Sequence, residues 1–294
     1  MRISGTTRLV GIFGDPVTHS LSPVIHNAAF KALGIDMAYV PFHVFDKDLK
    51  KAVGGIRALN LVGVSVTVPH KERIIKHLDR TDDMVRIIGS VNTVVNTDGE
   101  LKGYNTDAFG YLRSLKEEHG FDPLRKRVIL VGAGGSSRAI LYEFLALGVA
   151  SITLVNRTRS RAEALASEYG GLFPAAEMKV YTMDEFASCE GAACAKVIGE
   201  ADLIVNTTSV GLMNVGCLDL PLERLSRDAI VSDIVYRPLE TAFLRKARGL
   251  GLRAHSGLGM LVHQGAVAFE LWTRKEAPVD VMRQAALEAL KTIE

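Results

Sequence analysis

A glycine-rich turn is the first feature of this chain whose residue types and spacing predict chemistry. The run Gly-Ala-Gly-Gly-Ser at 132–136 follows the apolar stretch 128–131 and leads into a segment with helical periodicity. The free N–H groups at such a helix start, together with the positive end of the helix dipole, bind a pyrophosphate. Ser137 replaces the third glycine of the usual G-x-G-x-x-G pattern. That pattern is weak alone, so a turn without a ligand is the alternative.

The end of the next apolar stretch, 151–155, predicts which dinucleotide binds. It lies about 20 residues beyond the turn, where enzymes that use NAD carry an acidic residue for the ribose 2′-hydroxyl. Here the positions hold Asn156, Arg157 and Thr158, with Arg161 one helical turn further on. A guanidinium binds a 2′-phosphate bidentately, whereas a carboxylate would repel it. The predicted cofactor is therefore NADP. A solvated helix face is the alternative explanation of the two arginines.

A second group of polar residues occupies four short blocks of the first 107 residues. The blocks are 18–23, 65–71, 90–93 and 104–107. Each lies at the end of a predicted strand or the start of a predicted helix. Because doubly wound sheets bind ligands outside the carboxyl ends of their strands, we expect the blocks to converge on one cleft that faces the cofactor.

These residue types suit the interconversion of a hydroxyl and a carbonyl group. Hydride transfer to a ketone needs a proton donor at the forming alkoxide, and Lys71 could serve if burial moves its pKa toward neutrality. Asp107 could orient the ammonium group and share a proton path, although its charge opposes the effect of burial on Lys71. Asn92 could bond substrate hydroxyls through both of its amide groups. Three neutral hydroxyls could hold a substrate carboxylate: Ser20, Ser22 and Thr67.

Structural roles are the alternatives for these side chains. They are an N-cap for Ser22, a solvated lysine for Lys71, a turn residue for Asn92 and a helix N-cap for Asp107. The spacing of three nearby histidines matches no metal motif, so we expect structural roles for them and predict no metal site. These histidines are His19, His26 and His70.

Composition limits the class of protein. The chain has 294 residues, 48% of them hydrophobic and 23% charged, which is enough for two domains with separate cores. A net charge of +2 gives no electrostatic case for nucleic acid. Three cysteines without a C-x-x-C pair favour neither a disulfide framework nor a zinc site. With no signal peptide and no span for a bilayer, we expect a cytoplasmic protein without membrane contact, either a monomer or a homodimer.

The elements that must position these residues alternate between strand and helix. In residues 1–118 we expect strands at 8–13, 38–44 and 62–68, helices at 22–33, 46–59, 69–78 and 107–118, and a hairpin of 91–96 with 100–103. A loop with glycine, proline and charges at 118–124 predicts the domain boundary. Beyond it we expect strands at 128–131, 151–155, 179–182, 203–206 and 230–235, then helices at 257–273 and 279–292.

The predicted fold class is therefore α/β, with two domains. Residues 1–118 form an α/β substrate-binding domain, and residues 119–273 form a Rossmann-type domain with a doubly wound parallel sheet that binds NADP. The C-terminal helix, 274–294, is expected to pack back on the first domain. The active site is expected between the two domains.

Seven motifs, in order, resemble the shikimate dehydrogenase family over nearly the whole chain. They are 14–23 (GDPVTHSLSP), 66–71 (VTVPHK), 91–93 (VNT), 105–107 (NTD), 132–136 (GAGGS), 156–158 (NRT) and 257–264 (GLGMLVHQ). The resemblance implies reduction of 3-dehydroshikimate to shikimate with NADPH, in the shikimate pathway of aromatic amino-acid biosynthesis. It also implies that shikimate and 3-dehydroshikimate are the small-molecule partners.

The resemblance implies a role for particular residues. The residues it implies for catalysis are Lys71 and Asp107. Those it implies for substrate binding are Ser20, Ser22, Thr67, Asn92, Asp107, Tyr236 and Gln264. Those it implies for cofactor binding are Asp83, Gly132, Ala133, Gly134, Gly135, Ser136, Asn156, Arg157, Thr158, Arg161, Ile234 and Gly257.

Two departures from the family pattern leave alternatives open. The family usually has Asn before the V-T pair, where this chain has Ser65, and the segment 170–199 is longer than expected. A quinate or aminoshikimate dehydrogenase is therefore the enzymatic alternative. A non-catalytic NADP-binding sensor is the alternative of a different class, and the presence of both Lys71 and Asp107 argues against it.

Overall fold

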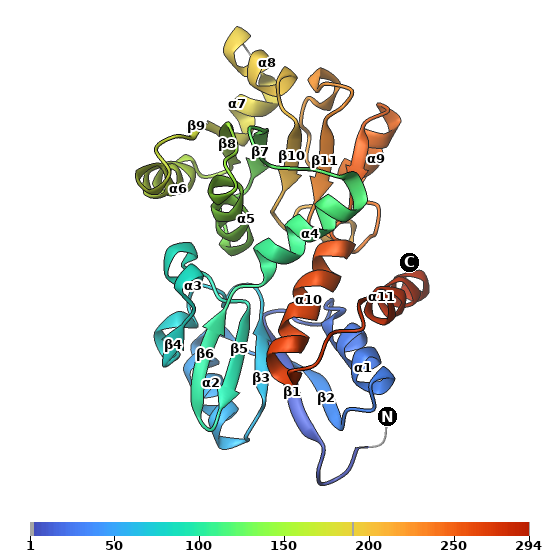
Figure 1. Ribbon diagram of the computed structural model, residues 1–294. Coiled ribbons are helices and arrows are strands. Elements are labelled where there is room, and N and C mark those ends of the chain that lie inside the picture. The colour runs from blue at the N-terminus through green and yellow to red at the C-terminus, as the bar shows by residue number, and fades with distance from the viewer. Residues whose placement is uncertain (1–2, 190, 294) are drawn as a thin grey trace. The chain divides into compact units, whose positions relative to one another are not determined.

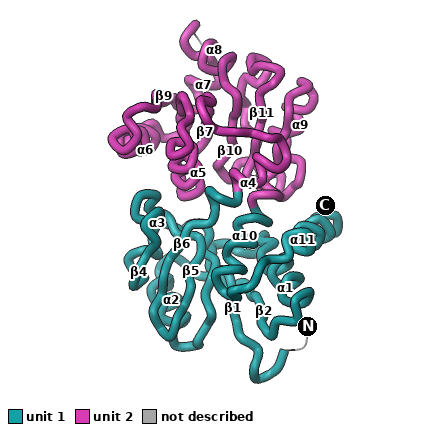
Figure 2. Tube along the Cα trace, in the orientation of Figure 1, with its two compact units in different colours: residues 1–110, 261–294 teal, residues 111–260 magenta. Residues whose placement is uncertain are grey.

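The computed structural model describes residues 3–189 and 191–293, which form two six-stranded sheets, one in each of two compact units. Unit 1 comprises residues 1–110 and 261–294, and unit 2 comprises residues 111–260 (Figures 1 and 2). The chain is thus an α/β protein of two units, in agreement with the predicted fold class.

The sheet of unit 1 is mixed. Its strands are β1 (Arg8–Gly14), β2 (Met37–His43), β3 (Gly63–Val66), β4 (Arg80–Thr81), β5 (Thr93–Thr97) and β6 (Glu100–Tyr104), in the order β2-β1-β3-β5-β6-β4. β1 pairs in parallel with β2 and β3, whereas β5 runs antiparallel to β3 and β6. The predicted hairpin is confirmed: Asp98 and Gly99 join β5 to β6, and both have positive φ, as a two-residue type I′ turn requires.

Helices cover both faces of this sheet. They are α1 (Ser22–Ala32), α2 (Leu49–Ala58), α3 (Asp83–Ile88), the start of α4 (Asp107–His119), most of α10 (Leu258–Thr273), and α11 (Val279–Ile293). Val53 and Ile56 of α2 share a core with Val64 and Leu101 of the sheet. Rings of α1, β2 and α10 pack in an aromatic cluster of His26, Phe30, Tyr39, Phe269 and Trp272. α11 packs against α1.

Unit 2 contains the predicted doubly wound parallel sheet. Its strands are β7 (Arg127–Val131), β8 (Ser151–Asn156), β9 (Glu177–Thr182), β10 (Leu203–Asn206), β11 (Ile230–Asp233) and β12 (Arg253–His255). All the pairings are parallel, and the order is β12-β11-β10-β7-β8-β9. The strand order therefore reverses between β7 and β10, which is where such sheets bind a dinucleotide.

The sheet of unit 2 is buried on both faces. Along β7, Val128 and Leu130 join one core cluster while Ile129 and Val131 join another. The helices that lie within this unit are α5 (Gly135–Ala146), α6 (Arg159–Leu172), α7 (Met183–Ser188), α8 (Ala192–Gly199) and α9 (Ala242–Gly249). Burial on both faces explains why these strands are continuous apolar runs in the sequence. Among the described residues, no helix has the length and apolarity needed to cross a membrane.

The division between the units falls within two helices. It lies at 110/111 in α4 and at 260/261 in α10, rather than at the expected 118/119 and 273/274. Phe121, in the loop that was expected to be the boundary, is buried in the core of unit 2. Trp272 of α10 donates to the Val94 carbonyl in unit 1 at 3.0 Å. Side-chain packing, which the loop composition does not reveal, therefore sets the two divisions.

One predicted helix and one alternative role were wrong. The segment 69–78 is a series of turns with a short 3₁₀ helix at Ile75–His77, because the carbonyl of Lys71 accepts its bond from the Val91 N–H instead of from a residue one helical turn on. Ser22 is the first residue of α1 and not its N-cap. The N–H of Ser22 donates to Oγ of Ser20, at 3.2 Å, so Ser20 satisfies one N–H group at the helix start.

Candidate active site

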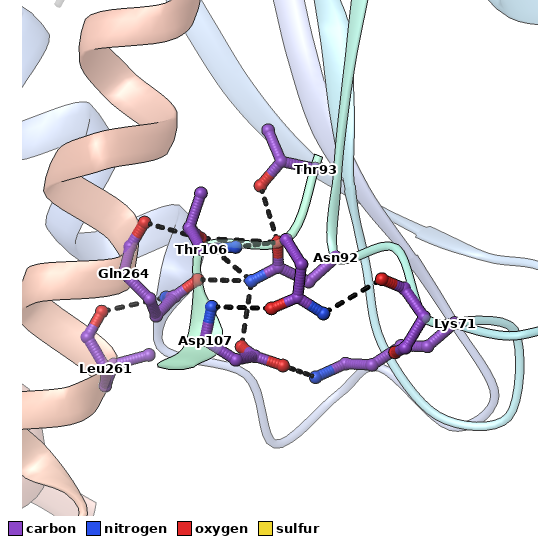
Figure 3. A network of polar contacts seen from close by, with 9 residues as sticks. Lys71, Asn92, Thr93, Thr106, Asp107, Leu261 and Gln264 are labelled. Carbon is purple, nitrogen blue, oxygen red and sulfur yellow. Dashed lines mark hydrogen bonds and ion pairs between the residues drawn. The ribbon is translucent and has the colours of Figure 1, made fainter. Parts of the chain in front are cut away.

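Lys71 and Asp107 form a buried ion pair in unit 1 (Figure 3). Nζ of Lys71 lies 2.5 Å from Oδ2 of Asp107, and the side chains are 13% and 5% exposed. Lys71 follows β3 in the turn segment, and Asp107 is the first residue of α4. A lysine held this close to a carboxylate and shielded from water has the arrangement of a general acid–base group.

Asn92 holds the other oxygen of Asp107. Its Nδ2 donates to Oδ1 of Asp107 at 2.8 Å and to Oγ1 of Thr106 at 2.9 Å. Its Oδ1 accepts from the backbone N–H of Thr106 at 2.9 Å and from Oγ1 of Thr93 at 3.0 Å. A backbone N–H can only donate, so the amide orientation of Asn92 is fixed by its contacts. Asn92 is therefore more than a turn residue: it connects β5, α4 and the ion pair.

Gln264 of α10 joins the same network within unit 1. Its Oε1 lies 3.4 Å from Nδ2 of Asn92, and its backbone carbonyl accepts from Oγ1 of Thr106 at 3.0 Å (Figure 3). A Cβ added to Gly110 would lie 2.5 Å from the backbone N of Gln264, so only glycine lets α4 start this close to α10. Gln264, which entered the prediction only through the family resemblance, thus lies beside Asn92.

The three candidate hydroxyls follow two neighbouring strands. Ser20 and Ser22 lie at the start of α1, after β1, and Thr67 directly follows β3. The backbone N–H of Thr67 donates to the Phe13 carbonyl at 2.9 Å, and its Cγ2 would lie 2.5 Å from a Cβ at Gly14. Parallel strands end at the same edge, so these hydroxyls share the edge of the sheet from which the Lys71 segment leaves.

Ser65, where the family pattern has Asn, is a buried residue of β3. It lies opposite Ile12 of β1 and Thr93 of β5 in the ladder, and it is 9% exposed. The effect on substrate choice stays a prediction.

His26 and His70 are buried in structural surroundings. The His26 ring stacks on Tyr39 with centroids 4.5 Å apart, and burial lowers the pKa of His26 to about 3. Nε2 of the buried His70 lies 2.7 Å from the Val44 carbonyl. Over the described residues, no group of three His, Cys, Asp or Glu side chains lies close enough to hold a metal ion.

In unit 2, the glycine-rich turn has the geometry of a phosphate cradle. Gly132 has φ of +117°, and a Cβ there would lie 2.6 Å from Oγ1 of Thr207, so the position accepts only glycine. Gly134 is the exposed N-cap of α5, and a Cβ there would meet no atom within 4 Å. Gly134 therefore leaves the start of α5 open on that side, where a pyrophosphate is expected in this fold.

Ser137, which replaces the third glycine, stabilises this turn. Its Oγ pairs with Oγ1 of Thr207 at 2.5 Å and accepts from the Gly134 N–H at 3.3 Å. Oγ1 of Thr207 in turn donates to the Val131 carbonyl at 2.7 Å. The serine therefore ties the turn to the end of β10, which is a role that a glycine could not perform.

Two arginines beside the turn are available for a phosphate. Arg157 and Arg161 are exposed and form no ion pair with any described residue. Arg159, between them, is paired with Glu185 and Glu163. Asn156 shapes this loop by donating to the Thr158 carbonyl at 2.8 Å. Uncompensated guanidinium groups at the end of β8 fit the 2′-phosphate of NADP, as the sequence predicts.

Ile234, Tyr236 and Gly257 lie close together after β11 and β12. A Cβ at Gly257 would collide with the Ile234 carbonyl, and the Gly257 N–H donates to the Val235 carbonyl at 3.3 Å. This close approach explains why Gly257 is glycine. Tyr236 is half-buried in the same turn.

Asp83 is the one cofactor candidate outside unit 2. It is the first residue of α3 in unit 1, its side chain is 91% exposed, and it pairs with Arg86 at 3.0 Å. The structure does not bring it together with the other cofactor candidates in one unit. Its predicted role has no support from its own contacts.

Sequence reasoning assigned no role to several residues that organise the two sites. They are Thr93, Asn105, Thr106, Asn206, Thr207 and Asp233. The first three lie in the polar blocks 90–93 and 104–107, where they were given no role of their own. A usable signal was also present for the last three, because each is a polar residue at the end of an apolar strand.

Models of one family match most of the chain. The shikimate dehydrogenase substrate binding domain matches residues 12–94, the shikimate/quinate 5-dehydrogenase model matches residues 116–213, and the shikimate 5′-dehydrogenase C-terminal domain matches residues 257–287.

Individual relatives cover nearly the full length. Shikimate dehydrogenase (NADP(+)) of Moorella thermoacetica is 46% identical over 99% of this chain and 96% of the relative. That of Desulforamulus reducens is 44% identical over 96% of this chain and 95% of the relative.

Solved structures agree with this relationship. A shikimate dehydrogenase in complex with NADP+ is 38% identical, with a TM-score of 0.88 over 98% of each chain. A quinate dehydrogenase from Corynebacterium glutamicum in complex with NAD is 30% identical, with a TM-score of 0.85 over 96% of this chain and 99% of that one. The matched models, the full-length relatives and the fold together place this chain in the shikimate dehydrogenase family.

Proposed function

We propose that this protein is an NADP-dependent shikimate dehydrogenase, which reduces 3-dehydroshikimate to shikimate with NADPH and catalyses the reverse reaction with NADP. The observation that carries the proposal is the buried pair of Lys71 and Asp107, with Asn92 on the second carboxylate oxygen. The pair lies in a chain whose full-length relatives are named for this activity.

The residues around Gly132 and Gly134 would hold NADPH, which when bound would supply the hydride. The chain's own task is to move a proton at the substrate oxygen. In the direction of reduction, the Lys71 ammonium group donates a proton to the carbonyl oxygen as that oxygen becomes an alkoxide. In the reverse direction, the neutral amine of Lys71 takes the proton from the substrate hydroxyl. Asp107 keeps the amine in place through Oδ2, and Asn92 prevents rotation of the carboxylate through Oδ1.

The remaining candidates serve to bind and orient the substrate. Ser20, Ser22 and Thr67 donate to the substrate carboxylate, and Gln264 bonds a ring hydroxyl. Asn92 bonds a ring hydroxyl by giving up its contact with Oγ1 of Thr106, while it keeps its bond to Asp107. Tyr236 is a further substrate contact by family resemblance.

Selection of NADP over NAD rests on Arg157 and Arg161. Both are exposed, and neither has a carboxylate partner among the described residues, so no existing ion pair must break when a 2′-phosphate binds. The helix start at Gly134 and the turn at Gly132 fit the pyrophosphate.

A panel of initial rates tests the proposal. Shikimate, quinate and aminoshikimate are each offered with NADP and with NAD, and reduced nicotinamide is followed at 340 nm. The proposal expects the highest specificity constant for shikimate with NADP. Faster turnover of quinate would favour the quinate dehydrogenase alternative, and binding of NADP without turnover of any substrate would favour a sensor.

Location and assembly are also proposals. An enzyme that depends on NADPH is expected in the cytoplasm, where that reductant is made, as a monomer or a homodimer. Size-exclusion chromatography with light scattering distinguishes the two forms.

A further inference from the structure

Asp233 is a buried carboxylate that the proposed mechanism leaves without a role. It is the last residue of β11, and none of its surface is exposed. Its Oδ1 accepts from Nδ2 of Asn206 and from the backbone N–H of Val235, both at 2.9 Å. Its Oδ2 accepts from Oγ1 of Thr241 at 2.8 Å. Three separate segments of unit 2 therefore meet at one side chain.

The first segment is the loop after β10, which Asn206 shapes. Nδ2 of Asn206 also donates to the Val210 carbonyl at 3.0 Å, and its Oδ1 accepts from the backbone N–H of Thr208 at 2.9 Å. The methyl group of Thr208 would lie 3.0 Å from a Cβ at Gly132, so this loop touches the glycine-rich turn. Asp233 thus anchors a loop that borders the proposed pyrophosphate site.

The second segment is the turn 234–236, and the third is the start of α9. The Val235 N–H points to Asp233, and the Ile234 carbonyl lies in close approach to Gly257. Thr241, which donates to Asp233, also caps α9 by accepting from the Leu244 N–H at 3.3 Å. The carboxylate therefore fixes the turn that carries Ile234 and Tyr236.

These segments belong to one half of the doubly wound sheet. Each half of such a sheet binds one mononucleotide, and the halves meet where the strand order reverses, here between β7 and β10. Arg157 and Arg161 follow β8 and mark the first half as the site of the adenosine 2′-phosphate. The half that contains β10, β11 and β12 is left for the nicotinamide nucleotide.

We propose that Asp233 is a positioning residue for the nicotinamide half of the cofactor site, acting through Asn206 and the turn 234–236. The proposal rests on the proposed function, because it needs NADP as the cofactor. A buried carboxylate without a cationic partner is expensive for folding, and an apolar side chain would be cheaper. No described residue forms an ion pair with Asp233; the groups that face it are Asn206, Thr241, the backbone of Val235, and Tyr111 of α4.

Equilibrium binding to the purified full-length chain tests the proposal. The probes are NADPH, followed by its own fluorescence, and adenosine 2′,5′-bisphosphate, which carries only the adenosine half of the cofactor. The variants are Asp233→Ala, which removes all three acceptor contacts, and Asp233→Asn, whose amide oxygen can still accept from Asn206 and Val235 while its NH₂ group donates to Thr241. Asp202→Ala is the matched control. That carboxylate lies just before β10, at the amino-terminal ends of the strands of the same sheet. It accepts from the Arg127 N–H at 2.9 Å and from Nζ of Lys126 at 3.0 Å.

The affinities for the two probes are expected to change differently. Asp233→Ala weakens NADPH binding by about tenfold or more, since bonds to a charged acceptor are lost, and leaves binding of the bisphosphate unchanged. Asp233→Asn restores NADPH binding, and Asp202→Ala binds both probes like the wild type. If Asp233→Ala does not fold, Thr241→Val removes one of the three contacts and is expected to weaken NADPH binding in the same direction, by a smaller factor.

Four results would overturn the proposal. If Asp233→Ala binds NADPH with wild-type affinity, Asp233 has no part in cofactor binding. If Asp233→Ala fails to fold and Thr241→Val binds NADPH with wild-type affinity, the conclusion is the same. Equal weakening of both probes would mean general damage to the unit. A wild-type chain that does not bind NADPH would overturn the proposed function itself, and this inference with it.

Discussion

The amide nitrogen of Asn92 lies 2.8 Å from Oδ1 of Asp107, so both oxygens of that carboxylate are occupied, Oδ2 by Lys71. Rotation of the carboxylate would break one of the two contacts. Because the amide of Asn92 is itself fixed by the backbone of Thr106, the position of the Lys71 amine is determined by a chain of contacts from β5 through α4. This rigidity is what a residue that transfers a proton to a defined substrate atom requires.

Lys71 and Asp107 are therefore expected to act as one catalytic unit. Lys71→Ala should lower turnover by about 10²–10⁴-fold, the usual contribution of a general acid or base, with a smaller effect on substrate affinity. The double variant Lys71→Ala/Asp107→Ala should lose little more than the worse single variant, because paired groups are not additive. The measurement is steady-state kinetics of all three, with shikimate binding determined separately by calorimetry.

Lys31→Ala is the control for that experiment, since Lys31 is an exposed lysine of the same unit, in the last turn of α1. It should retain wild-type turnover. Near-normal turnover in Lys71→Ala together with weakened shikimate binding would instead make Lys71 a substrate anchor, and the proton would have to come from another donor.

Cofactor preference is expected to depend on Arg157. Its replacement by Ala should raise the KM for NADP by about 10- to 100-fold, which corresponds to the loss of one charge-assisted hydrogen bond, and leave the KM for NAD nearly unchanged. Arg159→Ala is the matched control, because Arg159 lies two residues further on but is already paired with Glu185 and Glu163. Kinetics with both cofactors would show whether Arg157 is merely structural, in which case the two KM values would rise together.

One general rule allows the sequence to predict which polar residues of each unit lie near one another. Residues at the carboxyl ends of neighbouring parallel strands must lie at one edge of a sheet. This rule applies to Thr67 in the sheet of unit 1 and, separately, to Gly132 and Asn156 in the sheet of unit 2. The sheet of unit 2 and the hairpin at Asp98 could also be predicted, from long apolar runs and from a turn that needs positive φ.

What the sequence could not predict depends on long-range partners. The segment at Lys71 has helical composition, but its carbonyl is bonded to Val91, twenty positions away, and no local pattern contains that information. The orientation of Asn92 is likewise set by the backbone of Thr106, and the role of Ser137 by a hydroxyl on the end of β10. The unit divisions inside α4 and α10 follow from packing against distant side chains.

Shikimate is expected to be a much better substrate than quinate. Quinate carries an additional hydroxyl on the carbon that bears the carboxylate, where Ser20 and Ser22 are proposed to bind. The specificity constant for shikimate with NADP should exceed that for quinate. Ser65→Asn, which restores the family's usual residue at a buried position of β3, tests whether the smaller serine relaxes this choice. Comparable specificity constants for the two acids in the wild-type chain would contradict the assignment of the serines.

Acid should destabilise unit 1 through His26. Burial lowers the pKa of His26 from its ordinary value of 6.5 to about 3, so the folded protein keeps this ring neutral while the unfolded chain protonates it. As pH falls below 6.5 the unfolded state binds the extra proton, and the free energy of unfolding decreases until the pH reaches the folded pKa. Between pH 7.5 and pH 5 this single residue should remove about 2 kcal/mol of stability.

The variant His26→Phe isolates that effect, because a phenyl ring can keep the stacking on Tyr39 without a titratable nitrogen. Any change in packing adds an offset that does not depend on pH. His255, whose pKa is also lowered to about 3 by burial, titrates in both proteins and cancels in the difference. Urea unfolding of wild type and His26→Phe at pH 7.5, 6 and 5 gives the comparison. The wild type should lose stability relative to the variant as pH falls. A difference that stays constant over this range would mean that His26 has the same pKa in the folded and the unfolded protein, as an exposed ring would.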